Sequence, residues 1–441
     1  MNFEHKNAVS SIENKSEVLD DKWYDRFKEA GAFQDFEYLT GDKKYREEQK
    51  DKFLKGEIEN PTLDYPELEK FDFAGKEQKL LELKRNILDN EKNEIVRQLY
   101  RWKLNEKLAQ LRMLKNSKEE NDRKFFKYSN FIYGKPEKEV YDYTIYQAKR
   151  IVEDKLSSND QQIVDVAKNI KKRLIGGNES SIVLEKPSIS KKDFSDEGNL
   201  FLAEEIKKAF EEAINEYQIK GWKVFVDNEG KFSSINVGQE KKEVVIPENR
   251  KMKQKELTAL IAHEIKTHVL RRESGERTKL KLLGLGLDRY LKGEEGIATY
   301  EEQKIEGTND FSGFDGHFAI SLATGIDGNK RTFREVFEIL RDFYFIRSKK
   351  EKNEALKLAE NSAWNRCVRT FRGTTCKTQG ACLTRDIVYR EGNIRVWNVI
   401  KNNPEEERRF SIGKYDPSNS RHIWILDQLG ITESDLEELE K

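Results

Sequence analysis

Cysteine and proline are scarce in this 441-residue chain, and its formal net charge is zero. The three cysteines, Cys367, Cys376 and Cys382, are too few and too crowded for a disulfide framework and match no zinc-ribbon spacing, so we expect packed thiols in a reducing compartment. With 81 basic and 81 acidic residues, the chain lacks the basic excess that neutralises nucleic-acid phosphates. We therefore expect no nucleic-acid partner.

Long apolar runs are also missing. The longest candidates, such as LTALIA at 257–262, fall far short of the roughly 20 residues that span a bilayer. The first residues, MNFEHKNAVSSIENKSE, are too polar for a signal peptide. We therefore expect a cytoplasmic protein without membrane contact, and the 24 Phe, 16 Tyr and 6 Trp residues supply enough large side chains for folded cores.

The pattern of the chain divides it into three regions. Residues 1–60 are charged, with scattered aromatic residues, and are expected to form a partly ordered extension. Residues 61–177 are predicted to be helical, ending at the Gly176–Gly177 linker, and residues 178–441 are predicted to form the catalytic region. Within 77–114, leucines at helical spacing predict one long helix or a helical hairpin; a coiled coil is disfavoured because the stripe changes phase near Trp102.

The third region changes from helical to alternating patterns. Residues 222–227, 233–238 and 243–247 alternate as strands do, separated by turn sequences. We predict an α+β fold in which a small antiparallel sheet covers the apolar helix 256–272.

That helix carries the string HEIKTH, with His263, Glu264 and His268. The chain has only five histidines, and two of them flank an acid on this helix, which indicates a metal site. The alternative is that the two histidines share this helix by coincidence. At about 100° per residue, a regular helix would turn His268 roughly 140° away from His263. A π-bulge, or unwinding near Thr267, would restore convergence, and such bulges are frequent at functional sites.

A third ligand is expected from GEEGIA at 293–298, where Glu295 lies in a segment of helical character. The glycines on both sides of its paired acids allow close backbone approach. A fourth position would remain open for water in a catalytic site.

Four ordered segments carry a resemblance: LTALIAHEIKTHVLR, GLDRYLKGEEGIATYEE, RTFREVFEIL and RTFRGTTCKTQGACLTRDIVYREG. Together they resemble the microtubule-associated tyrosine carboxypeptidase family, in particular bacterial relatives that pair HExxxH with a downstream Gln-Glu-Gly-Leu-Ala motif. The resemblance covers roughly residues 75–400. It implies a zincin-like metallopeptidase that removes a C-terminal residue, with an aromatic residue as the candidate, from a peptide or protein.

The resemblance also implies residue roles. His263, His268 and Glu295 would bind zinc, and Glu264 would act in catalysis. Glu294, which stands where many bacterial members have Gln, is the alternative ligand, and Lys266 departs from the usual Gly.

The chemistry expected of such a site follows from zinc. A metal held by two imidazoles and a carboxylate lowers the pKa of bound water and polarises a carbonyl, and Glu264 would move the proton.

A carboxypeptidase must also hold a terminal carboxylate, for which we select Arg372, with Arg369, Lys377 and Arg385 as alternatives. His317 is interpreted as a structural histidine, with stabilisation of an oxyanion or support of a ligand as the alternatives.

The residues thus predict a zinc metallopeptidase, and the resemblance implies a carboxypeptidase acting on peptide or protein C-termini. An endopeptidase is one alternative. The other is a non-catalytic interaction module whose charged helices at 77–174 bind a partner, with zinc absent or structural.

Overall fold

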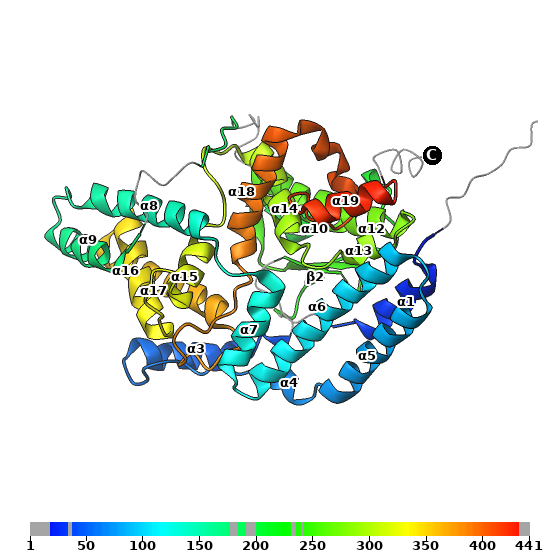
Figure 1. Cartoon of the computed structure of the whole chain (residues 1–441). Helices are drawn as coiled ribbons and strands as arrows, with labels where there is room; N and C mark the ends of the chain where they lie inside the picture. The colour runs from blue at the N-terminus through cyan, green and yellow to red at the C-terminus, as the bar shows by residue number, and fades with distance from the viewer. Residues whose placement is uncertain are drawn as a thin grey trace, which may run out of the picture.

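The computed structural model describes residues 18–33, 38–176, 184–190, 200–230, 235–239 and 241–431. They form a mainly helical protein with two small sheets, consistent with the predicted α+β class. The helices before residue 177 are α1 (Asp21–Ala30), α3 (Lys43–Leu54), α4 (Pro66–Glu69), α5 (Phe73–Asn90), α6 (Glu94–Lys118), α7 (Asp122–Tyr133), α8 (Lys138–Lys155) and α9 (Gln161–Arg173). In Figure 1, α6 crosses the front of the molecule beside α5, and α8 and α9 lie at the far left.

The later part of the chain supplies both sheets and the remaining helices. The strands are β1 (Leu200–Leu202), β2 (Lys223–Asp227), β3 (Asn236–Gly238), β4 (Glu243–Pro247) and β5 (Lys251–Lys253). The helices are α10 (Ala203–Glu216), α11 (Gln254–Ile261), the π-helix η2 (Ala262–Val269), α12 (Leu270–Arg277), α13 (Leu282–Leu285), α14 (Leu291–Glu306), α15 (Phe314–Thr324), α16 (Phe333–Arg347), α17 (Lys352–Phe371), α18 (Ile387–Asn402), the 3₁₀ helix η3 (Pro404–Ile412) and α19 (Ser420–Gln428).

The long apolar pattern before residue 115 forms a hairpin of α5 and α6, one of the two predicted forms. The Asn93 side chain begins α6 by accepting hydrogen bonds from the backbone, which satisfies amides that a helix start leaves unpaired. Not every leucine at helical spacing in this region is buried: Leu81 and Leu88 of α5 are exposed. Leu83 and Ile87 face the core instead.

The expected extension contains packed helices in its described part. Phe27 of α1 and Phe53 of α3 are buried in the main hydrophobic core, together with residues of α16 and α17. The Phe53 ring lies 5.3 Å from that of Phe333 and 5.5 Å from that of Trp364, measured between centroids. The scattered aromatic residues therefore mark core contacts rather than an extension, although residues 1–17 and 34–37 lie outside the described ranges.

The main sheet is mixed, which corrects the antiparallel prediction. Its strand order is β2-β4-β3: β3 pairs antiparallel with β4, whereas β2 pairs parallel with β4. Alternating polarity shows that a segment is a strand but does not fix the direction of its neighbour. The remaining pair, β1 and β5, is antiparallel.

The predicted placement of the apolar helix beneath the sheet is confirmed. Val244 and Ile246 of β4 share a buried cluster with Phe210 of α10 and with Ile265 and Val269 of η2. This cluster fixes one side of η2, so that its other side is available to face α14, which also contacts it.

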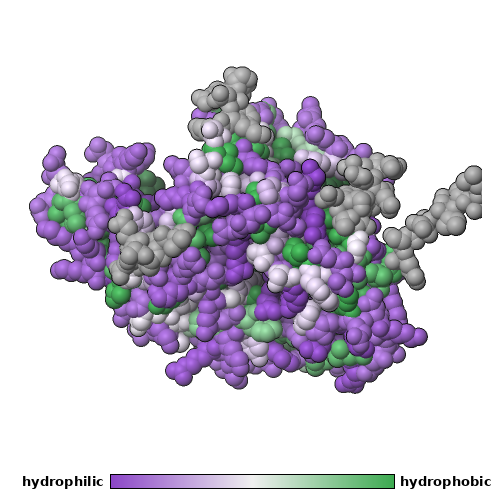
Figure 2. Space-filling view, turned by 45° about the horizontal axis from the view of Figure 1, so that its top comes forward, coloured by the Kyte–Doolittle hydropathy of each residue, from purple (hydrophilic) through white to green (hydrophobic). Residues whose placement is uncertain are grey.

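Most of the visible surface is hydrophilic. In Figure 2 purple side chains cover most of the face, and green ones form small scattered groups. Among the described residues, no helix combines the length and apolarity needed to cross a bilayer. The boundary at Gly176 and Gly177 stays a prediction, since Gly177 lies outside the described residues.

Candidate metal centre

The predicted bulge is present as η2, which interrupts the helix formed by α11 and α12. In a π-helix hydrogen bonds join residues i and i+5, so side chains five apart return to one side. The Thr267 hydroxyl follows the same spacing by donating to the Ala262 carbonyl at 3.0 Å. As a result, the rings of His263 and His268 lie with centroids 5.2 Å apart.

Glu295 of α14 joins the two histidines. One ligand atom from each of His263, His268 and Glu295 lies within 4.8 Å of the others, and His268 Nε2 is 3.8 Å from Glu295 Oε2. The glycines on both sides of the paired acids allow close contact with other parts of the chain: a Cβ added to Gly293 would come within 2.3 Å of the Asp416 Cα, and one on Gly296 within 2.4 Å of the Gly392 carbonyl oxygen. These contacts seat α14 against the segment around residue 416 and against α18.

A carboxylate holds the Nδ1 atom of each histidine. His263 Nδ1 lies 3.1 Å from Glu302 Oε2, and His268 Nδ1 lies 2.9 Å from Glu294 Oε1. Since a carboxylate only accepts, each Nδ1 donates its proton, so the neutral form of each imidazole has its lone pair on Nε2. This is the usual outer support of metal-binding histidines.

Glu294 supports a ligand rather than completing the group of three. Burial opposes its charge, but Lys414, whose Nζ lies 3.1 Å from Glu294 Oε1, and Arg271 hold the pKa of this carboxyl well below its usual range. Arg271 also donates to the Tyr415 carbonyl at 2.9 Å. The segment around residue 414 therefore fixes the carboxylate that orients His268.

The charge at the site suits a cation. Burial alone would lower the pKa of His263, but the carboxylates of Glu302, Glu264 and Glu295 raise it to about 9. Two imidazole nitrogens and one carboxylate oxygen are ligands that zinc prefers in catalytic sites. The residues present thus fit a zinc ion, with His263, His268 and Glu295 as its holders.

Glu264 faces the same cavity and is partly exposed. The two arginines that follow it along the chain are engaged elsewhere, since Arg271 pairs with Glu294 and Arg272 with Glu276. Within the described part of the chain, Glu264 has no hydrogen bond or ion pair. Its carboxylate is therefore available to a substrate or a water.

The cavity over these residues has a volume of about 410 Å³. Lys107 of α6 and Tyr133 of α7 line it from the N-terminal helices, and Val237 of β3 lines it from the sheet. Arg385 and Tyr389 line it from the start of α18. Helices from both halves of the chain therefore build the walls.

Arg372 does not line this cavity, unlike the alternatives Arg369 and Arg385. It is buried, and burial together with Arg46 lowers its pKa to about 10. The backbone amide of the next residue, Gly373, donates to the Tyr65 hydroxyl at 2.7 Å. Arg372 is thus part of the packing between the N-terminal helices and the end of α17.

Other residues singled out in the sequence lie elsewhere. His317 is fully buried, with Nε2 3.3 Å from Glu391 Oε1. All three cysteines are buried and unpaired, as expected. Lys266, the departure from the family motif, extends to Glu301 at 2.7 Å and does not line the cavity.

Sequence reasoning missed the supporting residues Glu302 and Lys414. Glu302 had a usable signal, because it follows Glu295 by two helical turns and so lies on the same face of α14. Lys414 had none, since only the folded chain brings it to Glu294.

Comparison with models of protein families shows to which family the chain belongs. The family model described as microtubule-associated tyrosine carboxypeptidase matches residues 51–176, 180–310 and 326–435, which together are well over half of the chain. The chain belongs to this family. A comparison with curated proteins found no match.

Membership in the microtubule-associated tyrosine carboxypeptidase family confirms the resemblance seen in the four motifs. It indicates a carboxypeptidase-like function. The second matched range contains His263, Glu264, His268 and Glu295, and the third contains Arg385 and Lys414. The candidate metal ligands therefore lie within the matched part of the chain, whereas Phe27, Lys28 and Gly31 line the cavity from outside it.

Proposed function

We propose that the protein is a zinc-dependent metallopeptidase that removes the C-terminal residue of a peptide or protein. The observation that carries the proposal is the convergence of His263, His268 and Glu295 in a cavity that Glu264 also faces. Family membership supports the carboxypeptidase part of the proposal.

Zinc bound by such residues lowers the pKa of water and polarises the scissile carbonyl. The Glu264 carboxylate accepts a proton from the attacking water and returns it to the departing amine. Glu302 and Glu294 keep the two imidazoles in the tautomer that presents Nε2. Side chains of α6 and α7 form part of the wall beside the reacting groups.

The cavity also accounts for the proposed kind of substrate. Tyr133, Tyr290 and Tyr389 line it, so an aromatic C-terminal side chain would meet ring surfaces there. Polar groups line it as well, which suits the charged end of a peptide.

Replacing Glu264 by Gln tests the proposal, because the amide keeps the shape of the side chain and cannot accept the proton. We expect zinc content near one per chain, as in the wild type, and loss of peptide hydrolysis by at least about 100-fold. Elemental analysis and release of the terminal amino acid measure the two quantities. Glu248→Gln, an exposed change in the turn after β4, is the matched control and should leave both unchanged.

Two outcomes would overturn the proposal. Undiminished hydrolysis by Glu264→Gln would remove Glu264 from the reaction. Absence of zinc from the wild-type protein, even after reconstitution, would favour the interaction module formed by the charged helices.

A further inference from the structure

The strand β2 has an outer edge that pairs with no other strand among the described residues. Its inner edge pairs with β4, and β3, which lines the metal cavity through Val237, forms the opposite edge of the sheet. Main-chain groups at a free edge can pair with a strand from another polypeptide. The outer edge of β2 is therefore a candidate interaction surface, and β4 and β3 separate it from the candidate metal centre.

The pairing of β2 with β4 determines which main-chain groups point outward. The Lys223 amide donates to the Lys242 carbonyl at 3.0 Å. In a parallel pair every second residue bonds to the neighbouring strand, so residues 223, 225 and 227 face β4 with their main chain. The amides and carbonyls of Val224 and Val226 therefore point to the free edge.

The middle of β2 lacks the usual protection of an edge strand. Phe225 is 45% exposed, whereas Val224 is buried in the cluster between the sheet and α10. Proteins commonly protect a free edge with a proline or with a charge in the strand, and the middle residues VFV include neither. The opposite edge, β3, is only three residues long and ends at Gly238. Of the two edges, β2 is thus the one suited to pairing.

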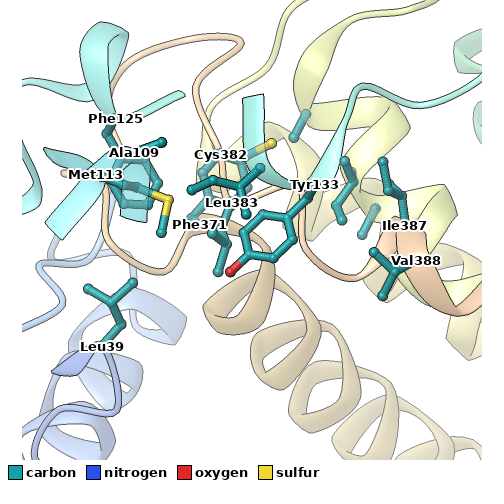
Figure 3. Close-up of a cluster of buried hydrophobic side chains, with 14 of the residues drawn as sticks. Leu39, Ala109, Met113, Phe125, Tyr133, Phe371, Cys382, Leu383, Ile387 and Val388 are labelled. Atoms are coloured by element: carbon teal, nitrogen blue, oxygen red, sulfur yellow. The ribbon is translucent and has the colours of Figure 1, made fainter. Parts of the chain in front are cut away.

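Apolar side chains at other places in the molecule are packed within the chain. Figure 3 shows Leu383 and Cys382 packed with Phe371 and close to Tyr133, and all four are buried. Phe225 differs from them, because it lines an open groove of about 610 Å³ between β2 and α10. A partner strand in this groove would cover the ring.

The sequence of β2, KVFVD, is complementary to itself. If two copies run antiparallel about a two-fold axis at Phe225, each Lys223 lies opposite the partner's Asp227 and the two rings lie side by side. Val224 of one copy then faces Val226 of the other, and each such pair exchanges both main-chain hydrogen bonds. A shift of the register by two residues would place Lys223 or Asp227 opposite a ring and lose the charge pairs.

The charge complementarity does not require a carboxylate without a partner. Asp227 Oδ1 accepts from the Glu229 amide at 3.1 Å, and it keeps its negative charge while it does so. The α10 side of the groove carries both signs as well, because Lys207 lies 3.9 Å from Glu204 and 3.7 Å from Glu211. Two copies of this surface would therefore meet without opposing fields of one sign.

We propose that β2 pairs with β2 of a second copy of this chain, which joins the two main sheets into one across a two-fold axis. The two cavities would lie toward the outer edges of the joined sheet, since β3 borders each of them. This inference goes beyond the proposed function and depends on neither zinc nor hydrolysis.

Disulfide cross-linking of the full chain tests the register. Phe225→Cys would place two thiols across the axis with about 4.5 Å between their Cα atoms, a separation that a disulfide accepts. With a mild oxidant we expect a covalent dimer on non-reducing electrophoresis. Lys223→Cys is the matched control: it is exposed on the same face, but its two copies would lie roughly 13 Å apart along the strands and should stay unlinked. The three native cysteines are buried.

Analytical ultracentrifugation measures the association without cross-links. The wild type should sediment as a dimer at high protein concentration, and Phe225→Lys should raise the dissociation constant by about 10-fold or more, because two ammonium groups would face each other. Val226→Pro should be monomeric, since it removes an outward amide that β4 does not use. Leu356→Lys changes another exposed apolar residue, on α17, and should leave the dimer unchanged. Circular dichroism should show equal helix content in all variants.

A wild-type protein that sediments as a monomer at every concentration would overturn the inference. Equal cross-linking of Phe225→Cys and Lys223→Cys would overturn the register, and a dimer that persists in Val226→Pro would show that another surface holds the copies together. Failure of the proposed function is distinguishable, since it would appear as missing zinc or as activity that survives Glu264→Gln.

Discussion

Two histidine environments in this molecule have opposite properties. At the candidate metal centre, His263 and His268 each give one nitrogen to a carboxylate and keep the other for the cavity. At His317 both nitrogens have protein neighbours: Nε2 faces Glu391, and Nδ1 lies 3.3 Å from the Ser321 hydroxyl. A histidine can therefore bind a metal when one of its ring nitrogens has no protein hydrogen-bond partner, whether or not the side chain is buried.

Their electrostatics differ in the same sense. Three carboxylates raise the pKa of His263 to about 9 despite burial, whereas burial keeps the pKa of His317 below its usual value despite Glu391. The first environment favours a positively charged ring, and the second favours the neutral ring.

The largest difference between the two environments is expected when one histidine is removed from each. His268→Ala should lower the zinc content from near one ion per chain to near zero and abolish hydrolysis, because the variant lacks one ligand and the group that Glu294 orients. His317→Gln should keep its zinc. Elemental analysis after gel filtration measures both, and full zinc in the His268→Ala protein would contradict the assignment.

A smaller effect is expected from the carboxylates behind the histidines. Glu302→Gln and Glu294→Gln should each weaken zinc affinity by about 10- to 100-fold, measured by competition with a chelator. Glu294→Gln should also lower the free energy of unfolding by roughly 3 kcal/mol or more, because Arg271 and Lys414 would keep buried charges without their partner. Identical unfolding curves for the two variants would show that Glu294 does not balance the buried charges of Arg271 and Lys414.

The smallest effect concerns pH. Because the pKa of His317 is lower in the folded protein than the usual 6.5, the unfolded chain binds more protons as the pH falls below that value. The free energy of unfolding should therefore decrease on acidification, by at most about 1.4 kcal/mol per pH unit from this group. Urea denaturation between pH 7.5 and 5.5 should show a flatter dependence for His317→Gln than for the wild type, and parallel curves would contradict the assignment.

The grouping of residues at the candidate metal centre could be predicted from the sequence, because few arrangements let two histidines of one helix converge. His263 and His268 at i and i+5 can share one ion only if the helix takes up an extra residue, and η2 does so. The glycines beside Glu294 and Glu295 likewise indicated close approach, which the structure places against Asp416 and Gly392.

Features that depend on contacts between distant parts of the chain could not be predicted from the sequence. Arg372 and Arg385 lie in one connection and are the same residue type, and only the packing of that connection decides which faces the cavity. The parallel pairing of β2 with β4 leaves no trace in the alternation of either strand. Phe27 and Phe53 lie among charged residues, so their burial becomes evident only when α16 and α17 are in place.

The contact between Lys414 and Glu294 has a consequence for biosynthesis. During synthesis, η2 and α14 emerge long before residue 414, so Glu294 at first has Arg271 but not Lys414 as a partner. A polypeptide that ends before this segment would keep the HExxxH string and lack one of the two cations behind His268. The surroundings of the candidate site are therefore complete only after a late part of the chain has been made.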